Sequence, residues 1–169
     1  MSDQIRGDPD FSCVCLYQGV SWLSRLIRFR TWSVYSHAAW WDPEFGLYEA
    51  WYPRMRKVVS LHIAHTPGTR VDLFRVRLPI SRRHQIAEWF EQRLGARYDL
   101  RGVLGFVSRR RVENPNWWFC SEAMLRVFEY AGNPLFYELP AWKASPGILA
   151  YSLALRRNGY VIVGDFDVC

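Results

Sequence analysis

The chain has 169 residues and a formal net charge of +6, and half of its residues are hydrophobic. This length suits one domain with one core, and the apolar content excludes an intrinsically disordered chain. We therefore expect residues 1–169 to form a single domain. The basic residues are mostly arginines, scattered apart from a few pairs and one run at 109–111, which predicts a basic surface with weak affinity for anionic material.

The N-terminus and the cysteines bear on location and cofactors. No apolar run is long enough to cross a bilayer, and residues 1–10 lack the apolar core of a signal peptide. We expect a cytoplasmic protein, unless a phage or a secretion system exports it by another route. Cys13 and Cys15 stand two apart on a predicted strand, cannot easily bridge each other, and have no partners at metal-ligand spacing. No disulfide framework, metal or organic cofactor is expected.

The first half of the chain predicts mainly strands. A strand over residues 11–17 is followed by a helix over 20–30, which has apolar residues at helical spacing. Alternation and β-branched content predict four more strands, at 34–41, 46–51, 57–63 and 71–78. Strands that are contiguous in sequence, with helices grouped around them, indicate an α+β fold with a mainly antiparallel sheet.

The second half predicts mainly helices. An apolar stripe and a closing Gly95 predict a helix over residues 81–94. The remaining expected elements are a loop over 98–116, a helix over 120–130, a short helix opened by Ser145 as cap and Pro146 in the first turn, and a strand over 160–163.

Two polar residues, His37 and Glu49, stand on neighbouring predicted strands joined by the turn sequence at 42–44. A three-residue loop there would place His37 directly opposite Glu49, with their Cβ atoms about 4.5–5.5 Å apart. The carboxylate could then bind one imidazole nitrogen and leave the other free as a base. A slip of one residue would send the two side chains to opposite faces.

Cys120 stands where an apolar segment turns into a helix. In the first helical turn, a sulfur faces unpaired N–H groups and the positive end of the helix dipole, which together with an imidazole would lower its pKa. A thiolate and an imidazolium oriented by a carboxylate form an activated nucleophile, and the backbone N–H of Cys120 or Ser121 could bind the oxyanion. Taken singly, these residues also suit an inert buried thiol and ordinary strand side chains.

The other histidines, His62, His65 and His84, have no comparable context and are expected on the surface. Ser36 and Ser121 are expected to make local hydrogen bonds rather than to act as nucleophiles.

Several short motifs together resemble the circularly permuted papain-like hydrolases of the YiiX/YebB type, within the NlpC-like superfamily. The resemblance covers roughly residues 11 to 155, and the cysteine helix follows the histidine strand as in the permuted group. The motifs are Thr31-x-Ser33-x-Tyr35-Ser36-His37, Tyr48-Glu49-Ala50, Gly95-x-x-Tyr98-Asp99, Phe119-Cys120-Ser121-Glu122 and Ser145-Pro146-Gly147.

This resemblance implies a papain-like fold of the permuted NlpC type, an antiparallel sheet packed against helices. It implies Cys120 as nucleophile, His37 as general base and Glu49 as the group that orients His37. Tyr98 looks similar to the tyrosine that helps to form the oxyanion hole in unpermuted relatives, although it lies farther from the cysteine in sequence. Ala38-Ala39 replaces the usual Val-Gly pair after the histidine, which keeps small residues on the strand.

Three functions follow from these features. The first is a cysteine-dependent hydrolase or acyltransferase that acts through an acyl-enzyme on a peptide, a cell-wall fragment or a lipid. The second is a catalytically weak module that binds lipid or peptide in the same cleft. The third, a nucleic-acid binder using the run at 109–111, has no standard nucleic-acid motif in support, so no specific nucleic-acid partner is expected.

Overall fold

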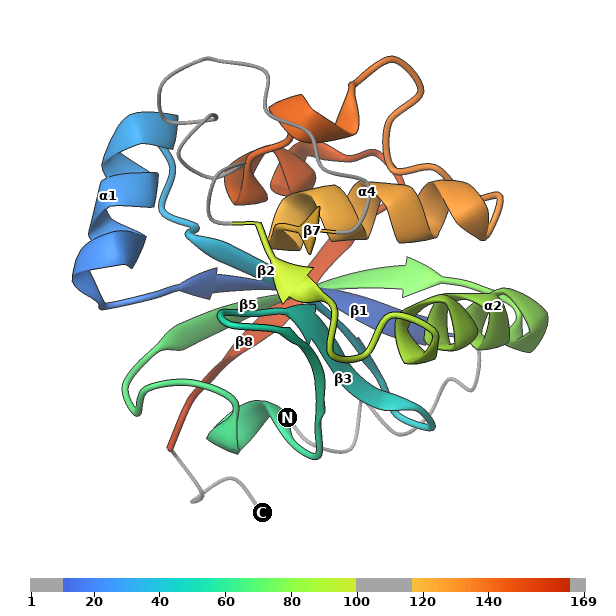
Figure 1. Cartoon of the computed structure of the whole chain (residues 1–169), viewed down its shortest axis with the longest axis horizontal. Helices are drawn as coiled ribbons and strands as arrows, with labels where there is room; N and C mark the ends of the chain where they lie inside the picture. The colour runs from blue at the N-terminus through green and yellow to red at the C-terminus, as the bar shows by residue number, and fades with distance from the viewer. Residues whose placement is uncertain (1–10, 100–116, 165–169) are drawn as a thin grey trace.

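The computed structural model describes residues 11–99 and 117–164 and is built around a six-stranded sheet (Figure 1). The strand order is β4-β3-β2-β1-β5-β8, and each neighbouring pair is antiparallel. This arrangement confirms the predicted α+β fold with an antiparallel sheet. The strands are β1 (Phe11–Gln18), β2 (His37–Asp42), β3 (Gly46–Ala50), β4 (Met55–Val58), β5 (Arg70–Arg77) and β8 (Arg156–Ile162).

Helices α2 and α4 lie on one face of this sheet, and α1 lies at its side (Figure 1). None of the helices in the described ranges is both long and apolar enough to cross a membrane. The run at 109–111, most of the predicted loop over 98–116, and Cys169 lie outside the described residues. The remaining elements are α1 (Trp22–Thr31), α2 (Ile80–Glu91), α4 (Cys120–Tyr130), the strands β6 (Arg97–Tyr98) and β7 (Trp117–Trp118), and the 3-10 helices η1 (Leu61–Ile63), η2 (Ala141–Lys143) and η3 (Pro146–Tyr151).

Two hydrophobic clusters cover the two faces of the sheet, because successive side chains of a strand alternate between faces. Val14 and Leu16 of β1 pack with the cluster that includes α2 and α4. Cys13, Cys15 and Tyr17 point to the other face, into a smaller cluster beneath η1. The central strand β1 is therefore buried on both sides, which explains its nearly continuous apolar sequence.

The predicted strand over residues 57–63 is wrong in its second half. Strand β4 ends at Val58, and the chain then turns into η1. The turn forms because the Ser60 hydroxyl accepts a hydrogen bond from the backbone N–H of His62 at 3.2 Å, an alternative to the sheet ladder. The helix predicted over 120–130 is confirmed at both ends. The last strand begins at Arg156, four residues earlier than predicted.

A buried ion pair ties the turn between β2 and β3 to α2. Asp42 accepts two hydrogen bonds from Arg83, at 2.7 Å from Nε and 2.8 Å from Nη2. The same carboxylate accepts the backbone N–H groups of Glu44 and Phe45 in the turn. This bidentate geometry offsets the free-energy cost of removing both charged groups from water.

Candidate functional site

The hairpin of β2 and β3 brings His37 and Glu49 to one face, in a register that differs from the expected one. Trp40 pairs with Tyr48 and Asp42 with Gly46, so the loop is 43–45 rather than 42–44. Continued along the strands, this register places His37 opposite Trp51 and leaves Glu49 diagonal to it. The shift is two residues, and because side chains alternate with a period of two, it preserves the shared face.

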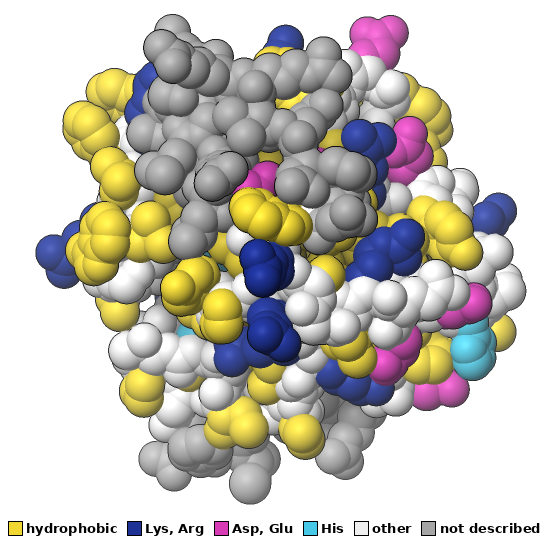
Figure 2. Space-filling model, viewed as in Figure 1, with side chains coloured by type: hydrophobic (Ala, Val, Ile, Leu, Met, Phe, Trp, Pro, Cys, Tyr) yellow, Lys and Arg dark blue, Asp and Glu magenta, His cyan; other side chains and the backbone are white. Residues whose placement is uncertain are grey.

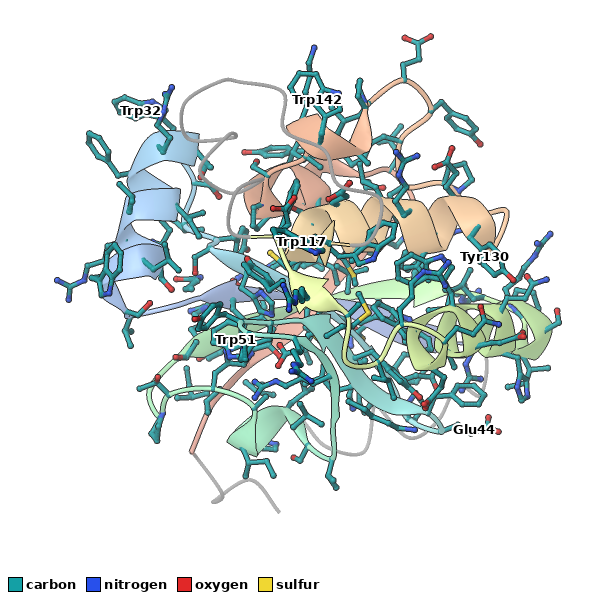
Figure 3. All side chains as sticks on the ribbon, in the orientation of Figure 1. Trp32, Glu44, Trp51, Trp117, Tyr130 and Trp142 are labelled. Atoms are coloured by element: carbon teal, nitrogen blue, oxygen red, sulfur yellow. The ribbon has the colours of Figure 1, made fainter. Side chains whose placement is uncertain are left out.

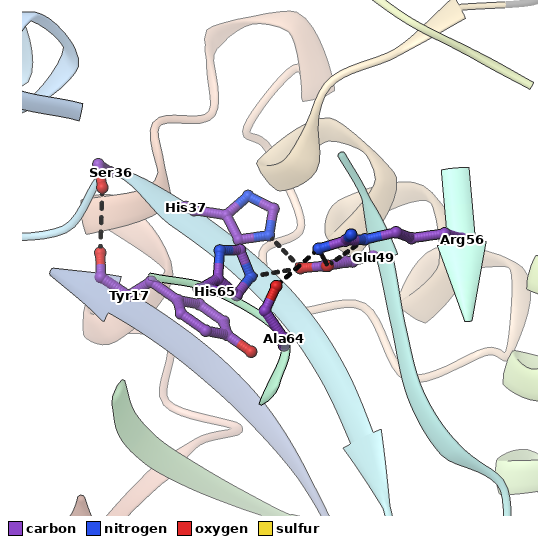
Figure 4. Close-up of polar contacts among 7 residues, drawn as sticks. All are labelled: Tyr17, Ser36, His37, Glu49, Arg56, Ala64 and His65. Carbon is purple, nitrogen blue, oxygen red and sulfur yellow. Dashed lines mark hydrogen bonds and ion pairs between the residues drawn. The ribbon is translucent and has the colours of Figure 1, made fainter. Parts of the chain in front are cut away.

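Glu49 is the centre of a buried hydrogen-bonded cluster (Figure 4). Its side chain is fully buried, and its Oε2 atom lies 2.7 Å from His37 Nε2 and 2.8 Å from His65 Nε2. Its Oε1 atom accepts a hydrogen bond from Arg56 Nε at 2.8 Å, and Arg56 Nη2 lies 2.6 Å from the same oxygen in the ion pair. Both oxygens are thus occupied, and the carboxylate is held in one orientation.

Arg56 and His65 are the members of this cluster that the sequence did not indicate, and the second of them is the larger correction. His65 was expected on the surface, but its side chain is about 5% exposed. The 3-10 turn η1 directs the chain back under the sheet, and Arg56 Nη2 holds the segment by donating to the Ala64 carbonyl at 2.8 Å. Sequence periodicity contains no signal for this approach, because His65 lies in a loop outside any strand or helix.

The protonation of the cluster follows from burial and from these contacts. Burial alone would raise the pKa of Glu49, but the hydrogen bonds from His37 and His65 outweigh it, and the pKa lies below its usual range. Burial lowers the pKa of His37, although its bond to Glu49 acts in the opposite direction. An ionised carboxylate only accepts, so His37 donates from Nε2, and its neutral ring keeps Nδ1 as an acceptor.

Aromatic rings enclose the two imidazoles. The Trp51 ring lies 4.9 Å from His37 and 4.3 Å from His65, both edge-on. The Tyr17 ring lies 5.2 Å from His37 and 4.2 Å from His65. The Tyr17 hydroxyl is buried and has no hydrogen-bond partner within the described ranges. The start of β2 is fixed beside Tyr17 because Ser36 donates from its hydroxyl to the Tyr17 carbonyl at 3.3 Å (Figure 4).

Cys120 is the first residue of α4 and is almost completely buried, with 2% of its surface exposed. Burial raises its pKa to about 11. The backbones of Ala38 and Ser121 and the hydroxyl of Tyr98 act as hydrogen-bond donors toward the sulfur and oppose this shift. The expected lowering of the pKa is therefore not found, because loss of water outweighs the donors at the helix N-terminus.

Tyr98 reaches Cys120 through a parallel strand pair. Its strand β6 pairs with β7, with Tyr98 beside Trp118, two residues before Cys120. The hydroxyl hydrogen-bonds to Cys120, and burial raises the pKa of Tyr98, with further contributions from the nearby sulfur, Asp99 and Glu49. The parallel pair therefore compensates for the long separation of Tyr98 and Cys120 in sequence.

The four predicted site residues thus form two contacting pairs, Cys120 with Tyr98 and His37 with Glu49. The pairs meet at Ala38, whose backbone contacts the sulfur and which directly follows His37. Alternation along β2 directs the His37 side chain to the face of Tyr17 and that of Ala38 to the face of α4.

A cavity of about 20 Å³ adjoins Cys120, a volume that suits a single water molecule. It is lined by Cys120, Tyr98, Ser121, Phe119 and, from α1, Ile27. Ser121 also donates to the Ala144 carbonyl at 2.6 Å, the kind of local hydrogen bond that was expected for it.

Among solved structures, the chain is similar to a protein of Escherichia coli O157:H7 that is described as the metalloprotein YiiX, DUF1105. The TM-score is 0.69 at 17% sequence identity, over 91% of this chain and 98% of the other. The chain has a YiiX-like fold. No protein-family model matches the sequence, and no curated protein matches it significantly. At this identity, the YiiX-like likeness concerns the fold alone.

One group of side chains at this site could hold a metal ion. His37, Glu49 and His65 each offer one ligand atom, and these atoms lie within 4.8 Å of one another. Two imidazoles and a carboxylate form a donor set that suits zinc. The residues therefore fit a metal ion, with Arg56 on the second carboxylate oxygen as a competing positive charge.

Proposed function

We propose that the protein is a cysteine-dependent hydrolase that cleaves an amide or ester bond through an acyl-enzyme. The contact between the Cys120 sulfur and the backbone of Ala38, the neighbour of His37, carries the proposal. It brings the thiol to the start of β2, one residue after His37, whose Nε2 atom lies 2.7 Å from Glu49. In the proposal, Cys120 is the nucleophile, His37 the general base and Glu49 the orienting carboxylate, and catalysis requires the His37 ring to turn toward the sulfur.

In the proposed reaction, the resting site is neutral, because the pKa of Cys120 is raised and that of His37 is lowered. His37 Nδ1 takes the proton from the sulfur as the sulfur attacks the carbonyl carbon and a C–S bond forms. The Tyr98 hydroxyl and a backbone N–H at the start of α4 donate to the oxyanion. The leaving amine or alcohol departs with the proton from His37, and water then hydrolyses the thioester.

Glu49, His65 and Arg56 act behind this step as positioning residues. Glu49 holds the His37 ring through Nε2, and its own orientation depends on the two donors at its other contacts. The proposed substrates are small peptides, cell-wall fragments or acyl lipids. A substrate requires more room than the cavity at Cys120 now offers, so the rings that line it must move.

Trapping the acyl-enzyme tests the proposal. Incubation with p-nitrophenyl butyrate or palmitate is expected to add one acyl group to Cys120, which mass spectrometry of peptides locates and hydroxylamine removes. Buried Cys13 and Cys15 serve as internal controls, since burial raises the pKa of both thiols and no general base is proposed for either. Tight binding of a non-hydrolysable palmitoyl amide without any Cys120 adduct or turnover would support the binding module and contradict the hydrolase.

A second candidate function, binding of a divalent metal by His37, Glu49 and His65, is favoured by the convergence of their ligand atoms. A bound zinc ion would supply Lewis acidity at this cluster. Because both functions use His37, metal binding and thiol chemistry are expected to exclude each other.

Calorimetric titration with zinc chloride tests this second candidate. One equivalent is expected to bind, and the change His65→Ala is expected to weaken binding by tenfold or more, in line with the loss of one ligand. His84→Ala, at an exposed position on α2, is the matched control and should change nothing. Equal affinity in His65→Ala and the unaltered protein would exclude the cluster as the site.

A further inference from the structure

The outer side of α1 exposes large apolar side chains to solvent. Trp22 is 76% exposed, Phe29 is 74% exposed, and Trp32, directly after the helix, is 88% exposed. Together with Leu26, they recur at intervals of three or four residues and so form one stripe. Figure 3 shows Trp32 at the end of α1, directed away from the body of the molecule.

The orientation of this stripe is opposite to that of an ordinary surface helix. Surface helices turn their apolar stripe to the core and their polar side to water. Here α1 is attached by a narrow inner side, where Ile27 packs against Phe119. Leu26 also lies exposed on the outer side. Contiguous exposed apolar surface of this kind marks an interaction site.

Basic residues accompany the stripe on the same helix. Helix α1 contains Arg25, Arg28 and Arg30 and neither aspartate nor glutamate. Figure 2 shows hydrophobic and basic side chains gathered over this part of the molecule. Aromatic rings flanked by guanidinium groups suit the boundary between water and an anionic bilayer, where rings enter the headgroup layer and arginines pair with phosphates.

We propose that α1, with Trp32, docks the protein on the surface of an anionic phospholipid bilayer. The helix would lie in the plane of the interface, since a segment of ten residues is too short to span it. The docking itself is independent of the thiol chemistry. One consequence rests on the proposed hydrolase: because Ile27 lines the cavity at Cys120, docking would present that cavity to lipid acyl groups.

Sedimentation with vesicles tests the docking. The full chain is expected to bind vesicles of phosphatidylcholine with 30 mol% phosphatidylglycerol at least tenfold more tightly than pure phosphatidylcholine vesicles, and to lose affinity as salt rises. The triple variant Trp22→Ser, Phe29→Ser and Trp32→Asn should bind at least tenfold more weakly. The matched control Val59→Ser, Tyr137→Ser and Leu153→Ser removes three equally exposed apolar side chains elsewhere and should bind normally.

Equal binding by the triple variant and its control would overturn the proposal, and so would equal binding to charged and neutral vesicles. A dimer in analytical ultracentrifugation that dissociates only in the triple variant would assign the stripe to a second copy of the chain and would also overturn the proposal.

Circular dichroism verifies the fold of both variants. Quenching of the exposed tryptophans by brominated lipid provides a second readout, and it should be lost in the triple variant. Acylation of Cys120 can succeed or fail separately, so the two proposals are tested apart.

Discussion

Replacing Cys120 with alanine is expected to lower the rate of p-nitrophenyl ester hydrolysis by at least about a thousandfold, to the background rate. The reason is chemical, because alanine cannot form the C–S bond of the acyl-enzyme and none of the neighbouring groups replaces it. The free energy of unfolding should fall by only about 1 kcal/mol, the cost of removing one small buried side-chain atom.

The matched control is Cys15→Ala, which removes a fully buried sulfur from the other face of the sheet. Its stability loss should be similar, and its turnover should stay within about threefold of the unaltered protein. Turnover and thermal melting measured on both variants separate the chemical role of Cys120 from a packing role. Full turnover in purified Cys120→Ala would contradict the hydrolase proposal.

The change Glu49→Gln is expected to lower turnover by about a hundredfold or more and the free energy of unfolding by about 3 kcal/mol. The amide keeps the shape of the carboxylate but removes its charge, so Arg56 loses its buried partner and the imidazole of His37 loses the acceptor that orients it. Urea unfolding measures the stability, and hydrolysis of the same ester measures the turnover.

Asp42→Asn provides the control for this second prediction, since Asp42 pairs with Arg83 and is as buried as Glu49. Its stability loss should match that of Glu49→Gln while turnover changes little.

The acid limb of the pH profile of turnover adds a further readout for Glu49→Gln. The Glu49 hydrogen bond raises the pKa of His37, so its removal should move the limb to lower pH. If the acid limb of the pH profile does not move, or if both variants lose turnover equally, the role of Glu49 is only structural.

The order of the elements followed from sequence because most of the evidence for it is local. The apolar face of residues 120–130 predicts α4 at both its ends, and alternation in the first half predicts most of the sheet. The sequence also predicted that His37 and Glu49 share a face of the sheet. The register error of two residues does not change this face, because side chains alternate with a period of two.

The contacts between the site residues could not be predicted from the sequence in this way. Tyr98 reaches Cys120 through a two-residue parallel pair, which carries no sequence signature. His65 joins Glu49 because a hydroxyl of Ser60 ends a strand early, where composition favoured its continuation. Both contacts, Tyr98 with Cys120 and His65 with Glu49, join residues that are far apart in sequence.

By itself, the sequence determined the α+β class, the helix that bears Cys120 and the common face of His37 and Glu49, because periodicity and local turn chemistry encode them. Only the tertiary structure decided the raised pKa of Cys120, the entry of His65 and the outward stripe of α1. Burial is the common physical reason. How much water a side chain keeps depends on which distant segments pack over it, and local patterns do not contain that information.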